Sequence, residues 1–411
     1  MRIGRTVSPA AAGIRLGGLI NAFFGGSDHR ELVRRENEIK DYFGVRHVYL
    51  VSSGKAALTL ILLAIRSLAA GKKVLIPAYT CFSVPSSIVK AGMKVQLCDI
   101  DIGTFDYAPD LLERSVDDET ACIVGIDLFG IPSDIERLKR IGHPRKIYIL
   151  EDAAQAMGVD WEGKKLGTRA DAGFFSLGRG KNITCGSGGV ILTDSDEIAN
   201  AVETHYRGLE SIGLKDGLAN CLETAGACLF IRPGLYWIPS GMSSLKLGET
   251  IFHKDFPMKR LSGREAAILQ EWDKTLEEWN GKRRENVLYF SEKLSGRFKF
   301  NTSLPYLRLP VLMRDKTERD RIASLSKERG LGVVRMYPNP VNEIPEIESG
   351  FTGMAFPSAS WVADRLLTIP THPNLSAADK DAICSLFHCR WAKHSCAEST
   401  DLFPIVPWAK R

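Results

Sequence analysis

Residues 147–156 read Ile-Tyr-Ile-Leu-Glu-Asp-Ala-Ala-Gln-Ala. The apolar run that ends at Leu150 predicts a buried β-strand, and Asp152 brings a carboxylate to the end of it. Gln155 follows three residues later, so the two side chains share a face if a helical turn begins there. A buried strand that ends in polar side chains is typical of α/β folds, whose ligand sites lie beyond the carboxyl ends of the strands.

Short apolar runs and helical patterns alternate on either side of this strand. Strands are predicted at residues 48–51, 73–77, 94–99, 121–126 and 146–150, and helices at residues 31–42, 56–68 and 83–91. The alternation favours βαβ units, and therefore an α/β fold with a mainly parallel central sheet flanked by helices. Polar residues follow predicted strands at Ser53, Tyr79, Asp152 and Ser176. We expect these four residues along one edge of the sheet.

The chain has 411 residues, more than one hydrophobic core usually holds, so two domains are predicted. We expect a large cofactor-binding domain over residues 1–262, with an N-terminal segment at 1–28 and an atypical insertion at 209–256. A smaller C-terminal α+β domain is expected over residues 263–390, followed by a tail at 391–411.

The predicted small domain carries fewer signals. Residues 263–298 are strongly helical and charged, and strands are predicted at Leu307–Met313 and Gly332–Tyr337. Ser376 is predicted as the N-cap of a last helix, with Asp379 as the supporting acid. The insertion has no clean period, so we interpret it as an interface or core segment.

Composition excludes several classes of function. The net charge of +5 is small for this length, and there is no arginine-rich arm or zinc-ligand pattern, so neither a nucleic-acid partner nor a metal is predicted. The nine cysteines form no CxxC pair, which favours reduced thiols in a cytoplasmic protein. Arg15 and several glycines interrupt the N-terminal apolar stretch, which argues against a signal peptide. No apolar run reaches the length of a membrane span.

Lys181 is the candidate catalytic residue. It ends the run Phe-Phe-Ser-Leu-Gly-Arg-Gly-Lys at residues 174–181, just before the glycine-rich stretch at 186–189. An amine and a strand-end carboxylate suit pyridoxal phosphate, because a lysine forms a Schiff base with this cofactor and an acid keeps its pyridine nitrogen protonated. Taken alone, Lys181 is also consistent with a surface lysine, and Asp152 with a helix N-cap.

The phosphate of such a cofactor needs its own site. Ser53 and Gly54 open a predicted helix directly after a strand, where free backbone amides and the helix dipole favour an anion. Gly54 permits close approach of the backbone, and the hydroxyl of Ser176 can join the same site. The signal is weak by itself, because many strand-to-helix turns have this composition.

Taken together, these motifs resemble the DegT/StrS family of pyridoxal-phosphate sugar aminotransferases, which have the aspartate-aminotransferase fold type. The matching stretches follow the family's order, at residues 52–58, 76–80, 92–101, 128–134, 151–156, 175–181, 188–189, 260–262 and 369–373. Residues 151–156 are similar to the family's Glu-Asp-Ala-Ala-Gln nearly letter for letter, and residues 175–181 reproduce its Phe-Ser-x4-Lys. The resemblance extends from about residue 30 to residue 388.

The resemblance implies a role for each matching residue. Lys181 would anchor the cofactor and afterwards move a proton between Cα and C4′. Asp152 would bind the pyridine nitrogen and Gln155 the ring hydroxyl. The phosphate would lie against Ser53, Gly54 and Ser176.

The resemblance also implies a reaction. Members of the family transfer an amino group, usually from glutamate, to a keto-sugar carried on a nucleotide. The products serve polysaccharide, lipopolysaccharide or secondary-metabolite sugar biosynthesis. Members are homodimers with active sites at the subunit interface, so a cytoplasmic homodimer is expected.

Four departures from the family pattern concern the substrate side. Lys55 replaces a threonine or serine beside the phosphate, where its ammonium would pair with the phosphate or point away to solvent. Cys81 stands where an aromatic residue usually faces the cofactor ring, and Phe82 follows one residue later. Met258 replaces an asparagine that reaches the other subunit's phosphate. The insertion at 209–256 lies where the substrate-side loop should run.

Two other interpretations remain open. Sugar dehydratases share this fold but carry histidine in place of the lysine, so Lys181 argues against that branch. A regulatory or scaffold protein is the second alternative, because residues 224–239 hold Trp and Tyr beside Arg, which suits a partner or a membrane surface. Equal liposome co-sedimentation of the wild type and of a 224–239 deletion would exclude the membrane contact.

Overall fold

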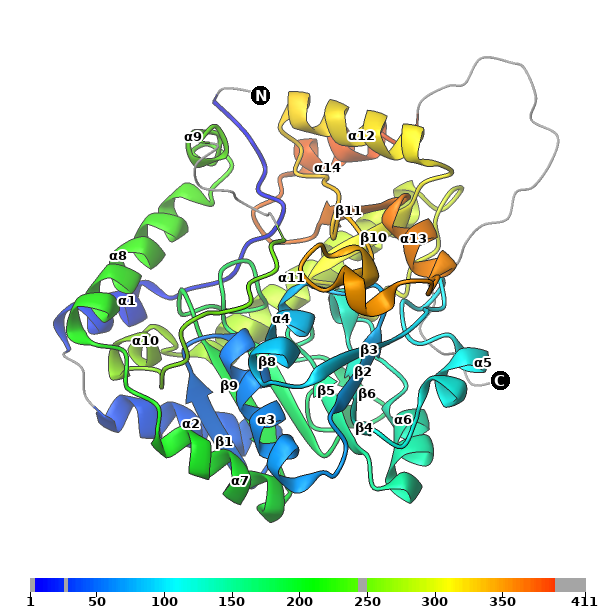
Figure 1. The fold of residues 1–411 in the computed structure, drawn as a ribbon. Helices are drawn as coiled ribbons and strands as arrows, with labels where there is room; N and C mark the ends of the chain where they lie inside the picture. Colours follow the sequence, from blue (N-terminus) through cyan, green and yellow to red (C-terminus); the bar gives the residue numbers. More distant parts are fainter. Residues whose placement is uncertain (1–3, 26–28, 243–249, 389–411) are drawn as a thin grey trace.

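The structure is a computed structural model that describes residues 4–25, 29–242 and 250–388. A large β-sheet with helices around it forms the lower part of the molecule in Figure 1. A smaller sheet with its own helices lies above it, in the yellow to red C-terminal part of the chain. This mixed architecture confirms the predicted α/β fold class.

Seven strands form the central sheet. They are β1 (His47–Val51), β2 (Lys73–Pro77), β3 (Lys94–Cys98), β4 (Thr120–Ile126), β5 (Tyr148–Asp152), β8 (Ala172–Ser176) and β9 (Gly189–Thr193), in the spatial order β1-β9-β8-β5-β4-β2-β3. The strands from β3 to β8 pair in parallel, and β9 runs antiparallel to both β1 and β8. Hence β1 and β8 point the same way, and the carboxyl ends of β1, β2, β5 and β8 meet at one edge, as the sequence predicts.

Helices cover both faces of this sheet. The helices of the first two thirds of the chain are α1 (Leu16–Phe24), α2 (His29–Phe43), α3 (Gly54–Leu68), α4 (Ser83–Lys90), α5 (Pro109–Leu112), α6 (Ile135–Gly142), α7 (Asp196–Arg207), α8 (Leu214–Phe230), α9 (Trp237–Ser240) and α10 (Gly263–Ile268). Helix α3 packs on β8 and β9, whereas α6 packs on β4 and β5. Side chains of β5 alternate accordingly: Ile149 belongs to the core beneath α6 and Leu150 to the larger core.

The C-terminal part combines a two-stranded sheet with four helices. Its elements are α11 (Trp272–Lys293), β10 (Arg308–Leu312), α12 (Lys316–Arg329), α13 (Pro357–Ala363), β11 (Leu366–Pro370) and α14 (Ala377–Ser385). The predicted helix at 263–298 is divided into α10 and α11, because Glu271 between them has a positive φ of 52°. Ser376 and Asp379 form the predicted capping box of α14.

The predicted strand at Gly332–Tyr337 is wrong. Its place beside β10 is taken by β11, which pairs antiparallel with β10 over Arg308–Leu312. Residues 332–337 make a single bridge, from Val334 to Thr368, and Tyr337 has a positive φ of 52° that no strand accommodates. Strand β11 itself was not predicted from the sequence.

The described part of the insertion contains a long helix, α8, and a short one, α9, which its pattern does not indicate. Helix α8 runs for 17 residues, yet it buries only Gly217, Cys221 and Thr224, so an apolar stripe is missing from the sequence. Leu222 and Leu229 are exposed on it. In the described residues, no helix is long and apolar enough to cross a membrane. A short hairpin, β6 (Asp160–Trp161) with β7 (Lys164–Lys165), completes the strands.

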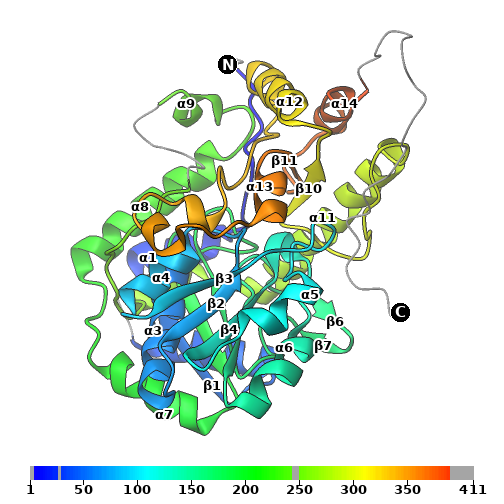
Figure 2. The ribbon, with the colours of Figure 1, turned by 45° about the vertical axis from the view of Figure 1, so that its right-hand side comes forward.

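The N-terminal segment passes along the C-terminal part, as Figure 2 shows in blue beside α12. Arg5 forms an ion pair with Asp379, and the Val7 N–H donates to the Gly330 carbonyl at 2.8 Å. The domain boundary at residue 262 remains a prediction, because the N-terminal segment packs against the C-terminal part.

Candidate active site

The carboxylate of Asp152 lies near the Lys181 ammonium at the end of β5. Asp152 is buried, and burial raises its pKa from 3.8 to about 6. Two weaker effects lower this pKa: the Ala154 N–H, which donates to the carboxylate at 3.0 Å, and the charge of Lys181. Among the residues that the structure describes, Asp152 has no ion-pair partner within 4.0 Å. The structure thus places a buried, incompletely compensated carboxylate close to the candidate lysine.

A buried arginine holds the backbone that carries Lys181. Arg283 of α11 is fully buried and donates to the carbonyls of Lys181 at 3.4 Å, Asn182 at 3.4 Å and Ala11 at 3.1 Å. The Lys181 N–H donates to the Gly178 carbonyl at 3.3 Å, which closes a tight turn. Burial lowers the pKa of Arg283 to about 9. Arg283 was not predicted from the sequence, because no motif around it marks its contact with the Lys181 backbone.

Gln155 is bonded into the same edge of the sheet. Its Nε2 donates to the Tyr337 hydroxyl at 2.9 Å, and its Oε1 accepts from the Phe129 N–H at 3.3 Å. The ring of Tyr337 contacts that of Tyr79 edge-on, with centroids 5.8 Å apart. Tyr337 therefore contacts Tyr79 and lies close enough to Asp152 for its charge to act on the Tyr337 hydroxyl. Burial, together with the nearby charges, raises the pKa of Tyr337 well above 10. The amide of Gln155 keeps a second N–H.

The predicted phosphate residues pack against one another. Ser53 caps α3, and its hydroxyl accepts from the Ala56 N–H at 3.1 Å. A Cβ at Gly54 would lie 2.8 Å from the Cβ of Ser176 and 3.0 Å from its Oγ. A Cβ at Gly189 would lie 2.3 Å from the Ser53 carbonyl oxygen. Glycine is required at both positions, so a backbone cradle forms where β1, β8 and the start of α3 converge.

Lys55, Phe82 and Met258, which lie on the predicted substrate side, have different surroundings in the structure. The ammonium of Lys55 lies 4.5 Å from the centroid of the Phe256 ring, and burial lowers its pKa while the nearby Cys81 raises it. This placement contradicts a side chain that points away to solvent. Phe82 is buried directly before α4, and its stacking on a cofactor stays a prediction. Met258 packs against the core.

These residues fit pyridoxal phosphate. A buried carboxylate without a cationic hydrogen-bond partner suits a protonated pyridine nitrogen. The cradle of Gly54 and Gly189 suits a phosphate at the N-terminus of α3, and the Ser176 hydroxyl adds a donor beside it. Lys181 supplies the amine from the loop after β8.

Replacing Gly54 with alanine should weaken cofactor binding. The new Cβ must displace Ser176 and its hydroxyl, which is expected to donate to the phosphate. Loss of one hydrogen bond to a charged group costs about 1.5–3 kcal/mol, which corresponds to about 10- to 150-fold in affinity. Titration of the cofactor-free protein with pyridoxal phosphate, followed by tryptophan fluorescence, measures the change. Gly226→Ala is the control, because its added Cβ has no atom within 4 Å apart from its chain neighbours and the nearby backbone of its own helix, α8. Equal affinities for the two variants would show that the cradle does not hold the phosphate.

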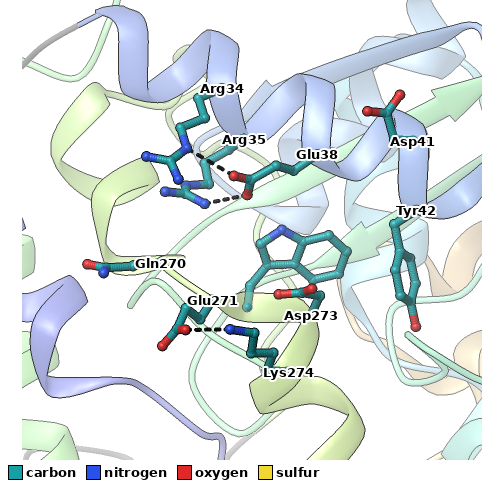
Figure 3. Close-up of a pocket in the computed structure, with 10 residues that line it drawn as sticks. Arg34, Arg35, Glu38, Asp41, Tyr42, Gln270, Glu271, Asp273 and Lys274 are labelled. Atoms are coloured by element: carbon teal, nitrogen blue, oxygen red, sulfur yellow. Dashed lines mark hydrogen bonds and ion pairs between the residues drawn. The ribbon is translucent and has the colours of Figure 1, made fainter.

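A pocket elsewhere on the surface is not part of this site. It has a volume of about 700 Å³, lies between α2 and the start of α11, and is lined by none of the predicted site residues (Figure 3). Four of its charged side chains pair with one another, because Arg34 bonds Glu38 at 3.0 Å and Lys274 bonds Glu271 at 2.7 Å. The carboxylates of Asp41 and Asp273 are exposed to solvent. Unlike the buried Asp152, the carboxylates of this pocket that lack an ion pair among the described residues are exposed.

Solved structures with the same fold were found among sugar aminotransferases. Helicobacter pylori PseC, an aminotransferase involved in the biosynthesis of pseudoaminic acid, is 17% identical with a TM-score of 0.75, over 93% of this chain and 98% of that chain. The putative sugar aminotransferase Spr1654 from Streptococcus pneumoniae, in its PLP form, is 18% identical with a TM-score of 0.74, over 93% and 97%. DesI, in the presence of its TDP-sugar product, is 19% identical with a TM-score of 0.74, over 94% and 93%.

These likenesses establish the fold, since the identities are low. The sequence itself carries the family assignment. Residues 26–388 match the model of the DegT/DnrJ/EryC1/StrS aminotransferase family, which includes every predicted site residue. The chain therefore belongs to the DegT/DnrJ/EryC1/StrS aminotransferase family.

Proposed function

We propose that this pyridoxal-phosphate-dependent aminotransferase moves an amino group from glutamate to a nucleotide-linked keto-sugar, with Lys181 as the catalytic residue. The observation that carries the proposal is the buried Asp152 carboxylate near Lys181, in a chain that belongs to an aminotransferase family. The structural neighbour DesI, whose structure was determined in the presence of its TDP-sugar product, supports a nucleotide-linked acceptor. The amino-sugar product would enter polysaccharide, lipopolysaccharide or secondary-metabolite assembly.

Each residue has a separate task in this proposal. When bound, pyridoxal phosphate supplies an electron sink for the bond that breaks at the amino donor's Cα. Lys181 would anchor the cofactor. Its Nζ would then accept the proton from the donor's Cα and deliver it to C4′. Asp152 holds the proton on the pyridine nitrogen, which its buried position favours. Arg283 fixes the Lys181 backbone, so the amine is presented from a rigid loop.

We also propose a cytoplasmic homodimer as the working form. The family resemblance supports the dimer, and the seven cysteines of the described residues, all of them free thiols, support a reducing compartment. Light scattering of the purified protein tests the dimer, and a monomer that retains full activity would contradict it.

Two half-reactions test the proposed function. We expect L-glutamate to convert the cofactor-loaded enzyme to its pyridoxamine form with release of 2-oxoglutarate. A nucleotide-linked keto-sugar should then restore the starting spectrum and yield an amino-sugar. Conversion by glutamate without any return by a panel of TDP- and UDP-linked keto-sugars would contradict the sugar acceptor.

A further inference from the structure

Gln155 has a buried N–H that no residue of the described chain accepts. Its side chain follows β5 and is 5% exposed. The Nε2 atom carries two N–H groups, and one of them donates to the Tyr337 hydroxyl at 2.9 Å. The other finds no acceptor among the residues that the structure describes. A buried donor left unpaired is unfavourable, so a ligand that accepts this N–H would complete the site.

The neighbours of Gln155 fix which end of its amide faces which way. A backbone N–H can only donate, so the atom that faces Phe129 is the oxygen Oε1, at 3.3 Å from the Phe129 nitrogen. The Nε2 atom lies on the side of Tyr337, whose hydroxyl accepts from it. If the amide turned over, two N–H donors would face each other at Phe129. The two contacts therefore select one of the two orientations of the amide.

Phe129 and Tyr337 hold these positions in unusual backbone conformations. Phe129 has a φ of 62° and Tyr337 a φ of 52°, and they are two of six non-glycine residues with positive φ in the described part of the chain. Such conformations are unfavourable, and they persist only where the surrounding structure enforces them, most often at functional sites. Both residues contact Gln155, which points to a function for that contact.

Further hydrogen bonds keep Phe129 and Tyr337 in place. The Leu307 N–H donates to the Phe129 carbonyl at 3.0 Å. The Tyr79 hydroxyl donates to the Tyr337 carbonyl at 3.3 Å, and the rings of the two tyrosines meet edge-on. The amide of Gln155 is thus held between the edge of the central sheet and the C-terminal part of the chain.

We infer that Phe129 and Tyr337 orient the Gln155 amide so that its free N–H meets the ring hydroxyl of pyridoxal phosphate. This inference rests on the proposed function and on the predicted contact of Gln155, and it adds two positioning residues to that contact. The ring oxygen becomes negative when it loses its proton, and an N–H donor stabilises that charge. The opposite orientation would place the amide oxygen against it, which is repulsive. Phe129 acts through its backbone N–H and Tyr337 through its hydroxyl.

The visible band of the cofactor-loaded protein depends on this contact. Once Lys181 is joined to the cofactor, its nitrogen and the ring oxygen share a proton, which is lost as the pH rises. The negative charge then remains on the ring oxygen alone, where the Gln155 N–H stabilises it. Removal of this N–H should therefore raise the pH midpoint at which the visible band changes.

Gln155→Met and Tyr337→Phe test the inference through this pH midpoint. Gln155→Met removes the donor, so the midpoint should rise by about 1–2 pH units, which is equivalent to one hydrogen bond to a charged group. Tyr337→Phe removes only a hydroxyl, so the midpoint should rise by about 0.4–1 unit, which is equivalent to one neutral hydrogen bond. Tyr107→Phe is the control and should have the midpoint of the wild type. Its buried hydroxyl donates to the carbonyls of Leu75 and Val124 in the core beneath α6.

The double variant of Gln155→Met and Tyr337→Phe shows whether Tyr337 acts through Gln155. We expect it to have the midpoint of Gln155→Met alone, because the contact that Tyr337 orients is already lost. Shifts that add would mean that the Tyr337 hydroxyl meets the cofactor itself, which would overturn the inference. If Gln155→Met does not take up the cofactor, equal midpoints for Tyr337→Phe and Tyr107→Phe would overturn it as well.

The outcomes distinguish this inference from the proposed function. If the wild type transfers amino groups and neither variant moves the midpoint, the inference is wrong and the aminotransferase stands. A loss of activity in Tyr337→Phe at an unchanged midpoint would show a purely structural role, which also contradicts the inference. If the midpoints shift as expected while the wild type reacts with neither glutamate nor a keto-sugar, the proposed function fails and the role of Phe129 and Tyr337 stands.

Discussion

Lys181→Ala should abolish both the visible absorption band of the cofactor-loaded protein and its aminotransferase activity. The variant loses the amine that anchors the cofactor and the group that carries the Cα proton. Removal of a positioned proton carrier alone lowers rates by about 10²- to 10⁴-fold. Cofactor retention should also fall, because the cradle at Gly54 would then hold the phosphate without a covalent anchor.

Absorption spectra and the rate of 2-oxoglutarate formation measure these losses. Lys164→Ala is the matched control, because Lys164 is an exposed lysine in the β6–β7 hairpin. It should keep the band and the rate of the wild type. If the Lys181→Ala protein retained the visible band, another lysine would anchor the cofactor. The half-buried Lys55 would be the first lysine to test.

Asp152→Asn should have opposite effects on the cofactor-free and the cofactor-loaded protein. In the free protein the buried carboxylate has a pKa of about 6, against an ordinary value of 3.8. The folded state therefore binds the proton more tightly than the unfolded state. The resulting stability is fully present below about pH 4 and is lost as the pH rises through 6. The rise corresponds to about 3 kcal/mol, so the asparagine variant should be more stable by up to that amount above pH 7.

The cofactor-loaded protein should show the reverse order. Asp152 then faces a protonated pyridine nitrogen, and removal of one partner of a buried charge pair costs about 2–5 kcal/mol. Thermal unfolding of both forms at pH 5 and pH 8 measures the two effects. Asp106→Asn is the control: its pKa is also raised to about 6 by burial, but its carboxylate accepts from the backbone N–H groups of Tyr107 and Asp134 at 2.8 Å. A cofactor-dependent reversal in Asp106→Asn as well, or none in Asp152→Asn, would contradict the assigned role.

The alternating strands and helices of the central sheet could be predicted from the sequence. Strands such as Tyr148–Asp152 are buried on both faces, so they read as continuous apolar runs between helices with clear spacing. The C-terminal part gave errors because its local pattern is ambiguous. Residues 332–337 and β11 both carry apolar and β-branched residues, and the pairing of β10 with β11 decides which segment becomes the strand. Helix α8 was missed because most of its faces are exposed, which leaves no apolar stripe to detect.

Some residues of the candidate site could also be predicted from the sequence, and others could not. Asp152, Gln155, Ser176 and Lys181 follow strands of one sheet, so their order along the chain predicts that they meet. Arg283 comes from α11, far along the chain, and no spacing rule relates it to Lys181. Tyr337, which has a positive φ of 52°, meets Gln155 from a segment that the sequence predicted as a strand. Tertiary packing places these two residues, and single-sequence patterns carry no record of it.

Reduction of the cofactor-loaded protein with borohydride, followed by peptide mass spectrometry, tests the central claim most directly. Reduction makes the bond between the cofactor and its lysine permanent, so the modified residue identifies the anchor. We expect the phosphopyridoxyl group on Lys181 and on no other lysine. Modification of Lys55 instead, or no site-specific modification of a protein that binds the cofactor, would contradict the account.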